Sequence, residues 1–226
     1  MNDPLVSIVT PFLGPRSYLS EAIDSVRAQT LENWELILVD DGAANEVLEL
    51  AEAMAQTDQR IRLIPLSGPP RSGPAAARNR GLAVAKGVFI AFLDGDDVLL
   101  PEMLALTTRA LRDEPRATMV MGPTIWWHPA NPGRDWVEPM HGRAGRLIPP
   151  PRLVRDIILL QLGHVPCICS VLIRRSAIVA VGGFEEEFRL YEDQTLWVKL
   201  MLIHPTAVIG TPLSRYRQHD GSAAPN

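Results

Sequence analysis

The chain has 226 residues, with 22 Lys and Arg against 26 Asp and Glu, which gives a formal net charge of −4 at pH 7. Its 46% hydrophobic and 21% charged residues are typical of a globular chain and argue against disorder. No apolar run approaches the ~18 residues that a membrane-spanning helix needs. The acidic balance also lacks the basic footprint of a nucleic-acid-binding protein.

The ends of the chain and its cysteines indicate a reducing compartment. The N-terminal sequence Met-Asn-Asp-Pro lacks the basic flank of a signal peptide. Cys167 and Cys169 are too close for an unstrained bridge within one strand, so we expect free thiols. These observations predict a cytoplasmic protein without an integral membrane segment, for which peripheral association with the inner face of the membrane stays open. The length fits one domain, residues 1–226.

The first hundred residues alternate short apolar runs with helical patterns. Strands are predicted at residues 5–9, 36–39, 61–66 and 88–93, the first of them ending at Thr10-Pro11. Helices are predicted at 19–26, 45–57 and 75–86, and a further one opens at Pro101. This alternation predicts an α/β fold with a mostly parallel central sheet and helices on both faces.

The second half has a weaker pattern. Residues 123–151 are rich in Pro, Gly and Trp and have little periodicity. A helix at about 152–162, a strand around 168–174 and a helix from near Glu192 follow. The helix at 152–162 fits either the core or a lipid-facing patch, and we favour the core. We interpret this half as an elaboration of the sheet and not as a separate domain.

Two predicted strands end in clusters of carboxylates. Residues 39–42 read Val-Asp-Asp-Gly, and residues 93–97 read Leu-Asp-Gly-Asp-Asp. Ligands of open parallel sheets bind outside the carboxyl ends of the strands. Acids gathered on one rim repel each other, and a hard divalent cation such as Mn²⁺ or Mg²⁺ would offset that repulsion. Asp is also common in turns and helix caps, but two clusters on one predicted rim favour a site.

The chain resembles the family 2 glycosyltransferases through seven short motifs that occur in order. They lie at residues 7–11, 39–42, 77–81, 92–97 with Pro101, 181–184, 192–197 and 216–219. The resemblance spans residues 5 to about 222. It implies the GT-A fold and an inverting enzyme that uses a nucleotide-diphosphate sugar. It also implies a donor-binding half at 1–100 and an acceptor-binding half at 101–226, which contains the base and a C-terminal metal and diphosphate loop.

The resemblance implies roles for the donor-binding residues. Asp96 of the Asp-x-Asp element and His219 would hold Mn²⁺ or Mg²⁺, while Asp97 has no ligand role and would support its neighbours or cap a helix. The donor, a UDP-sugar by default, would contact Thr10, Pro11, Asp41, Arg78 and Asp94. The family usually has Ser after Asp-Asp-Gly, whereas Ala43 stands here.

Arg78 and Arg80 present a local difficulty. Both lie in the first half of a predicted helix, where the helix dipole disfavours cations. A ligand or a carboxylate should therefore lie beside them. Arginine forks match phosphate oxygens. The resemblance implies that the Arg-Asn pair at 78–79 borders the nucleotide pocket, so we expect Arg78 to bind the diphosphate and Arg80 to face solvent. The Pro/Gly-rich loop at 67–74, which contains Arg71, could close over the donor.

The resemblance places the chemistry at Glu192 and Asp193. Asp193 would be the general base of a single displacement with inversion, and Glu192 its structural or acceptor-binding neighbour. Adjacent helical residues point about 100° apart, so we expect only one of them to face the cleft. Trp126 and Trp127 could stack on an acceptor sugar, although buried tryptophan is more often packing. The acceptor would be a saccharide or lipid-linked saccharide, as in polysaccharide biosynthesis.

Two other readings use the same acidic rim. A nucleotidyltransferase should carry a Gly-rich basic loop after the first strand, and residues 12–16 match such a loop only weakly. A metal-dependent phosphatase would place its nucleophile there, where Thr10-Pro11 stands. A non-catalytic sugar-nucleotide-binding protein would need a damaged site, but every matched position is present.

Overall fold

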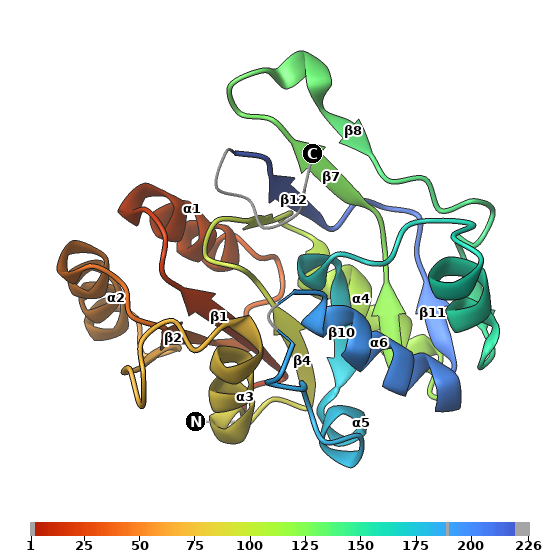
Figure 1. The fold of residues 1–226 in the computed structure, drawn as a ribbon, viewed down its shortest axis with the longest axis horizontal. Helices are drawn as coiled ribbons and strands as arrows, with labels where there is room; N and C mark the ends of the chain where they lie inside the picture. Colours follow the sequence, from red (N-terminus) through yellow and green to blue (C-terminus); the bar gives the residue numbers. More distant parts are fainter. Residues whose placement is uncertain (1–2, 189, 220–226) are drawn as a thin grey trace.

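The structure is a computed structural model that describes residues 3–188 and 190–219. A mixed eight-stranded sheet has the strand order β3-β2-β1-β4-β10-β6-β11-β9, and a second sheet has the order β5-β12-β7-β8 (Figure 1). The strands of the first half are β1 (Val6–Phe12), β2 (Trp34–Asp40), β3 (Ile61–Ile64), β4 (Phe89–Phe92) and β5 (Val98–Leu99). Those of the second half are β6 (Met119–Met121), β7 (Thr124–Trp127), β8 (Trp136–Val137), β9 (Arg146–Ile148), β10 (Val171–Arg174), β11 (Thr206–Val208) and β12 (Ser214–Arg217).

The α-helices are α1 (Arg16–Arg27), α2 (Asn45–Thr57), α3 (Pro74–Val84), α4 (Met103–Asp113), α5 (Arg175–Ala180) and α6 (Glu192–Ile203). Two short 3-10 helices, η1 (Pro132–Arg134) and η3 (Ile168–Ser170), and a π-helix, η2 (Val154–Leu159), complete the second half. No helix among the described residues has the length and apolar character needed to cross a membrane.

The predicted parallel strands are present and leave an open crevice. β1 pairs in parallel with both β2 and β4, and β2 pairs in parallel with β3. The chain therefore builds outward from β1 in one direction through β2 and β3, and in the other direction from β4. Ligands of open α/β sheets bind at such a reversal, outside the carboxyl ends of the strands.

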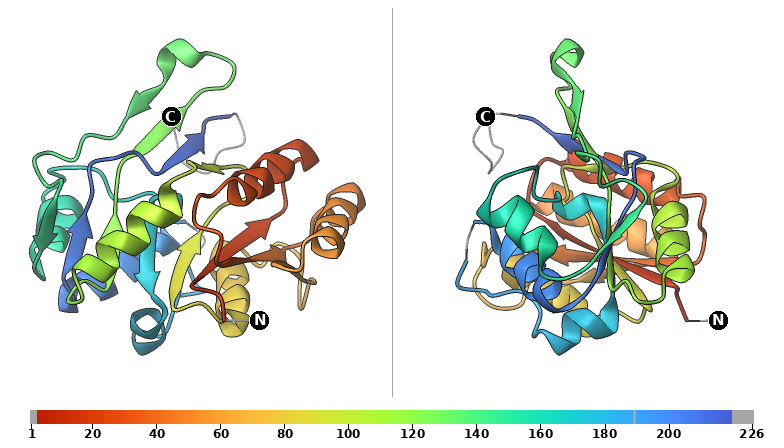
Figure 2. Two further views of the ribbon diagram at one scale, coloured as in Figure 1. Left: turned by 180° about the vertical axis from the view of Figure 1, so that it is seen from behind. Right: turned by 90° about the vertical axis from the view of Figure 1, so that its right-hand side faces the viewer.

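Helices cover both faces of the large sheet, as predicted (Figure 2). One apolar core contains Leu19, Leu50 and Leu104 from α1, α2 and α4. The other contains Ala77, Ile178 and Leu196 from α3, α5 and α6. The apolar strands supply both cores because successive side chains of a strand point to opposite faces.

Close packing fixes α3 against β1. A Cβ atom on Gly81 would lie 2.3 Å from Cγ1 of Val9, so only glycine lets the helix backbone approach the sheet this closely. This contact sets the depth of α3 and therefore the position of Arg78, one turn earlier, beside the carboxyl end of β4.

The first strand is longer than predicted. It continues through Thr10 and Pro11 to Phe12, because both residues keep their parallel register with Leu38 and Val39. Pairing with β4 has already ended at Val9. Pro11 thus occupies a position with one strand neighbour, where a missing N–H group is tolerated.

The second half departs most from the sequence prediction. β10 is antiparallel to both β4 and β6, so the sheet is parallel only in part. The predicted helix at 152–162 is confined to η2, and the second sheet was not predicted at all. The segment that includes β7, η1 and β8 projects above the body of the molecule in Figure 2.

Candidate functional site

A cavity of about 590 Å³ lies at the carboxyl ends of β1, β2 and β4. Its first wall includes Pro11, Asp41, Asp94 and Asp96, which end or follow these strands. The opposite wall comes from the second sheet, the segment at 164–168 and the start of α6, and includes Trp126, Glu138, His164, Tyr216, Glu192 and Asp193. Residues from both ends of the chain therefore border one space of a size typical of ligand sites.

A buried arginine connects the two walls. Arg78, with a side chain only 2% exposed, donates from Nη2 to Asp94 Oδ1 at 2.6 Å and from Nη1 to Glu192 Oε1 at 2.5 Å. The two carboxylates hold the pKa of the Arg78 guanidinium above its ordinary value although burial opposes them. The carboxylate expected beside a cation in this helix is thus present. Both terminal nitrogens of Arg78 already donate to protein carboxylates, so they are less available to a diphosphate than predicted.

Arg80 does not face solvent, contrary to the sequence prediction. Its Nη2 donates to the carbonyl oxygen of Asp40 at 2.7 Å and lies 3.4 Å from Oδ1 of Asp41. Its Nη1 donates to the carbonyl of Ser67 at 3.0 Å. Arg80 therefore ties α3 to the acidic end of β2.

Asp41 is held by the loop that precedes α3. Its Oδ1 accepts from the amide and the hydroxyl of Ser72, and its Oδ2 accepts from the amide of Gly73. The amide of Arg71 also donates to the Asp41 carbonyl at 2.7 Å. The loop is thus docked against β2, and Asp41 lines the cavity as expected of a donor-binding residue.

Thr10 and Pro11 have different surroundings in the structure. Pro11 lines the cavity, whereas Thr10 does not. Thr10 is 1% exposed, and its Oγ1 has no hydrogen-bond partner among the described residues. The expected donor contact of the Thr10 side chain is therefore not supported, because that side chain is buried away from the cavity.

Asp96 and His219 meet at the acidic rim. Oδ2 of Asp96 lies 3.1 Å from Nε2 of His219, and about two fifths of the Asp96 side chain is exposed. Burial and the neighbouring Asp94 charge raise the pKa of Asp96, and His219 opposes them. An accessible carboxylate beside an imidazole is a donor set that fits Mn²⁺ or Mg²⁺. Asp94 is turned toward Arg78 and adds no preformed contact to this pair.

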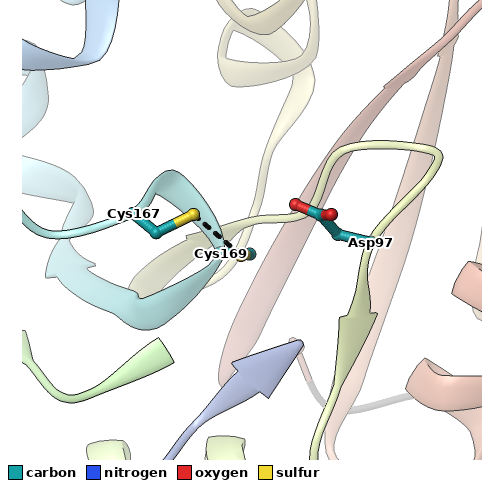
Figure 3. Close-up of side chains that lie close together, drawn as sticks. All are labelled: Asp97, Cys167 and Cys169. Carbon is teal, nitrogen blue, oxygen red and sulfur yellow. Dashed lines mark hydrogen bonds between the residues drawn. The ribbon is translucent and has the colours of Figure 1, made fainter. Parts of the chain in front are cut away.

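Asp97, Cys167 and Cys169 lie together behind this rim (Figure 3). Asp97 is fully buried, and its Oδ1 accepts from the amide of Arg217 at 2.9 Å, so it anchors β12. Burial raises its pKa well above the ordinary value. The cysteines are free thiols, as predicted, with their sulfur atoms 3.2 Å apart. Asp97 was expected to support its neighbours, and its hydrogen bond to the amide of Arg217 agrees with that expectation.

Both carboxylates at the start of α6 border the cavity, which corrects the prediction that only one would. The preceding Tyr191 has a φ of 61°, in the left-handed region, and the helix begins directly after it. The cavity is lined by the consecutive residues 190–194, so it borders both the residues before the helix and its first turn. Glu192 is occupied by Arg78, and Asp193 accepts the amide of Gln194 at Oδ1.

Burial raises the pKa of Asp193 to about 6. The Arg78 charge opposes this rise, and Glu192 and Asp94 add to it. A carboxyl group with this pKa is ionised at neutral pH and is a better proton acceptor than an ordinary aspartate.

The two tryptophans have different surroundings. Trp126 lines the cavity and stacks on Trp136, with ring centroids 5.3 Å apart. Trp127 does not line it and instead packs under the guanidinium groups of Arg215 and Arg217. Trp126 therefore remains a candidate for acceptor contact, and Trp127 acts in packing.

Sequence reasoning missed Glu138, His164 and Tyr216 as cavity residues. Tyr216 belongs to a quoted motif but received no role, and the other two lie in segments without periodicity. The register of the second sheet places Tyr216 opposite Trp126, and Trp126 opposite Trp136. The sequence signal that could have indicated this wall was the pair of tryptophans, Trp126 and Trp136, which face each other in the β7–β8 hairpin.

We expect Arg78→Met to destabilise the fold by about 3–5 kcal/mol, because it leaves the buried Glu192 carboxylate without its cation. Adding Glu192→Gln should recover at least ~1 kcal/mol of that loss. Urea unfolding of wild type, both single variants and the double variant measures this coupling. As a control, Arg109→Met removes the exposed pair with Asp113 and should change stability by less than ~1 kcal/mol. Additive losses in the double variant would contradict the pairing.

Comparison with known proteins agrees with this geometry. A family model described as "Glycosyl transferase family 2" matches residues 7–182. An Escherichia coli protein named as the UDP-Glc:alpha-D-GlcNAc-diphosphoundecaprenol beta-1,3-glucosyltransferase WfgD is 30% identical over all of this chain and 82% of its own length. An uncharacterized glycosyltransferase of Rickettsia conorii is 27% identical over 98% of the chain. The chain spans about a third of the length of that relative, 34%.

Solved structures share the fold. The Staphylococcus aureus TarS fragment 1–349 in complex with UDP-GlcNAc matches 96% of this chain and 59% of its own, with a TM-score of 0.74 and 18% identity. The same fragment in complex with UDP matches with a TM-score of 0.72. The match confirms the predicted GT-A fold. With its family model covering most of the sequence, the chain belongs to glycosyl transferase family 2.

Proposed function

We propose that this protein transfers a sugar from a nucleotide-diphosphate donor, a UDP-sugar, to an acceptor hydroxyl with inversion. The observation that carries the proposal is one cavity bordered by Asp96 on one wall and by Asp193 on the other, with His219 in contact with Asp96. Asp193 is a carboxylate with a pKa near neutrality and no direct ion pair among the described residues. Membership of the family and the UDP donor named for WfgD support this choice.

The donor would lie along the first wall. Pro11 and Asp41 would contact the nucleotide, Asp94 the ribose side, and Asp96 with His219 would hold Mn²⁺ or Mg²⁺. Such a cation, when bound, would offset the charge of the diphosphate. The UDP and UDP-GlcNAc complexes of TarS support a uridine donor. We propose that residues 1–100 form this donor-binding half and residues 101–226 the acceptor-binding half.

We expect UDP with Mn²⁺ to raise the melting temperature by roughly 5–10 °C at a concentration near 100 times the dissociation constant. GDP should raise it less. Asp96→Asn should lose most of the metal-dependent part of the shift because it removes a ligand carboxylate. Asp113→Asn, an exposed carboxylate on α4, is the matched control and should retain the full shift. If UDP gives no shift with either metal, the donor assignment is wrong.

The chemistry would be a single displacement in which the acceptor hydroxyl attacks the anomeric carbon opposite the nucleotide. Asp193 would accept the hydroxyl proton as the new bond forms, and the nucleoside diphosphate would leave. Glu192 is engaged by Arg78, so we propose that it orients α6 and does not itself bind the acceptor. Arg78 would act by holding Asp94 and Glu192 in place across the cavity.

We expect Asp193→Asn to lower kcat by about 10²–10⁴-fold, because the amide cannot accept the proton. UDP affinity should change by less than about twofold. In wild type, kcat/KM should be constant above pH 7 and fall about tenfold per pH unit below pH 6, where Asp193 becomes protonated. Steady-state kinetics and UDP titration measure both, with Asp113→Asn as control. Equal loss of UDP binding in Asp193→Asn would make Asp193 a donor ligand.

Product analysis separates the alternatives. Transfer or slow hydrolysis releases free nucleoside diphosphate, whereas a nucleotidyltransferase releases pyrophosphate. UDP binding without turnover would instead favour the non-catalytic binding protein. We propose a saccharide or lipid-linked saccharide acceptor, supported by the lipid-linked substrate in the name of WfgD, and a place at the membrane surface.

A further inference from the structure

We propose that the second-sheet wall of the cavity selects an uncharged saccharide as acceptor. This wall, called the saccharide wall below, consists of Trp126, Glu138, His164 and Tyr216. The proposal rests on the proposed function and adds the chemical class of the acceptor and the residues that recognise it. None of the four residues carries a role in donor binding.

The saccharide wall is a rigid platform. Trp136, Trp126 and Tyr216 lie opposite one another on β8, β7 and β12, so their rings form a row across the second sheet. Trp126 stacks on Trp136 at 5.3 Å and meets Tyr216 edge-to-face at 5.1 Å. His164 packs beside Trp136 at 5.3 Å. Aromatic surface of this kind covers the apolar face of a sugar ring at little cost in side-chain entropy.

The polar groups of the wall belong to residues that border the same cavity. Glu138 accepts from Trp126 Nε1 at 2.9 Å through Oε1 and from the amide of Thr124 at 3.2 Å through Oε2. Each carboxylate oxygen has a second lone pair, so Glu138 keeps capacity for a ligand hydroxyl. No hydrogen bond joins the Tyr216 hydroxyl or the His164 ring to another residue in the ranges 3–188 and 190–219. These groups suit a ligand that carries several hydroxyls.

The charge of the cavity decides the class of sugar. Among the described residues, six carboxylates line it, from Asp41, Asp94, Asp96, Glu138, Glu192 and Asp193, against the single guanidinium of Arg78. Arg78 is used by Asp94 and Glu192, so Glu138 and Asp193 at the acceptor end have no cation paired with them. A sugar acid placed there would set like charges side by side, which weakens its binding. The wall therefore fits a neutral pyranose and rejects uronic acids.

Saturation-transfer NMR at pH 8 on the whole chain with UDP and Mg²⁺ tests this. The probes are methyl glucoside, N-acetylglucosamine and glucuronic acid, the last being the same ring with a carboxylate. We expect at least one neutral probe to bind at least about tenfold more tightly than glucuronic acid. Tyr216→Phe removes one hydroxyl that has no described partner, so it should fold and weaken the neutral probe about three- to tenfold.

Glu138→Gln tests the charge directly. It keeps an acceptor oxygen, and we expect it to narrow the preference for the neutral probe by at least about threefold while UDP affinity stays within twofold. Glu187→Gln removes an exposed carboxylate outside the cavity and is the control for net charge. Equal binding of neutral and anionic probes, or unchanged binding in Tyr216→Phe, would overturn the proposal. Absence of UDP binding would instead overturn the proposed function.

A different face carries a second inference, which we propose as a docking surface for an anionic phospholipid bilayer. Leu159, Leu160 and Leu162 are exposed by 71%, 55% and 56% at the end of η2, the teal helix beside β11 in Figure 1. Val154 and Ile157 of the same helix are buried, so the helix is anchored through its other side. Adjacent exposed leucines of this kind mark an interaction site.

A basic cavity is joined to these leucines although the whole chain has a net charge of −4. A small cavity of about 120 Å³ is lined by His141, Arg143, Arg146, Arg152 and a single carboxylate, Asp156. Arg143 donates to the carbonyl of Leu162 at 3.1 Å, which joins the basic cavity to the leucines. His164 of the saccharide wall follows Leu162 by two residues. Apolar side chains beside basic ones fit acyl chains beside anionic headgroups.

Co-sedimentation of the whole chain with phosphatidylcholine vesicles, with and without 30% phosphatidylglycerol, tests the surface. We expect binding to the anionic vesicles at least about fivefold tighter than to the neutral ones. The triple variant Leu159→Ser, Leu160→Ser and Leu162→Ser should lose at least about tenfold, and Arg146→Gln about threefold to fivefold. The double variant Val88→Ser and Val179→Ser, exposed elsewhere, should bind as wild type does.

Three results would overturn this surface. They are failure to bind anionic vesicles, equal binding to both vesicle types, and unchanged binding by the triple leucine variant. If inorganic phosphate abolishes vesicle binding and the triple leucine variant binds normally, the basic cavity holds free phosphate and is not a bilayer contact.

Discussion

The buried guanidinium of Arg78 is the interaction on which the rest of the site depends. It links Asp94, at the carboxyl end of β4, to Glu192, at the start of α6, which lies 114 positions beyond Arg78 in the sequence. Without it, the low dielectric of the cavity would leave two facing carboxylates to repel each other. The same charge also opposes the effect of burial on Asp193 and so contributes to a pKa of about 6. One side chain thus fixes contacts across the site and moderates the rise that burial produces in the pKa of Asp193.

The interleaved sheet explains why such a link is possible. β10, from the second half of the chain, is inserted between β4 and β6, so the two halves share one large sheet. The helices α3 and α6 then lie on the same face, where they share a core with Trp197 and Ala77. Gly81 brings α3 onto β1 without an intervening side chain. Backbone packing therefore places Arg78 and Glu192 close enough for their charges to pair.

Local patterns were sufficient for much of the fold and for the acidic rim. Alternating apolar runs identified β1 to β4, and the helix at 45–57 has the bounds that its composition predicted. The position of Asp41, Asp94 and Asp96 followed from the rule that ligands bind beyond strand ends. Within the motif at 7–11, only the tertiary structure shows that Pro11 borders the cavity and that Thr10 is buried.

Contacts that depend on register and on long-range pairing could not be read in advance. Glu138 meets Trp126 only through the hairpin of β7 and β8, whose two-residue second strand has almost no pattern of its own. Arg78 was expected to bind phosphate because its chemistry permits it, but the choice between a ligand and a carboxylate depends on where α6 begins. Sequence supplies the functional group in such cases, and tertiary structure selects its partner.

The start of α6 combines an unfavourable backbone conformation at Tyr191 with two carboxylates that border the cavity. Tyr191 adopts a left-handed conformation that costs about 1 kcal/mol for a residue with a side chain. This turn lets the helix meet the cavity with its first turn, so that Glu192 and Asp193 both border the same space. It also aims the positive end of the helix dipole at these carboxylates. Burial disfavours the ionised form of Asp193 and the Arg78 charge favours it, so Asp193 stays ionised at neutral pH yet accepts a proton more readily than an aspartate in water.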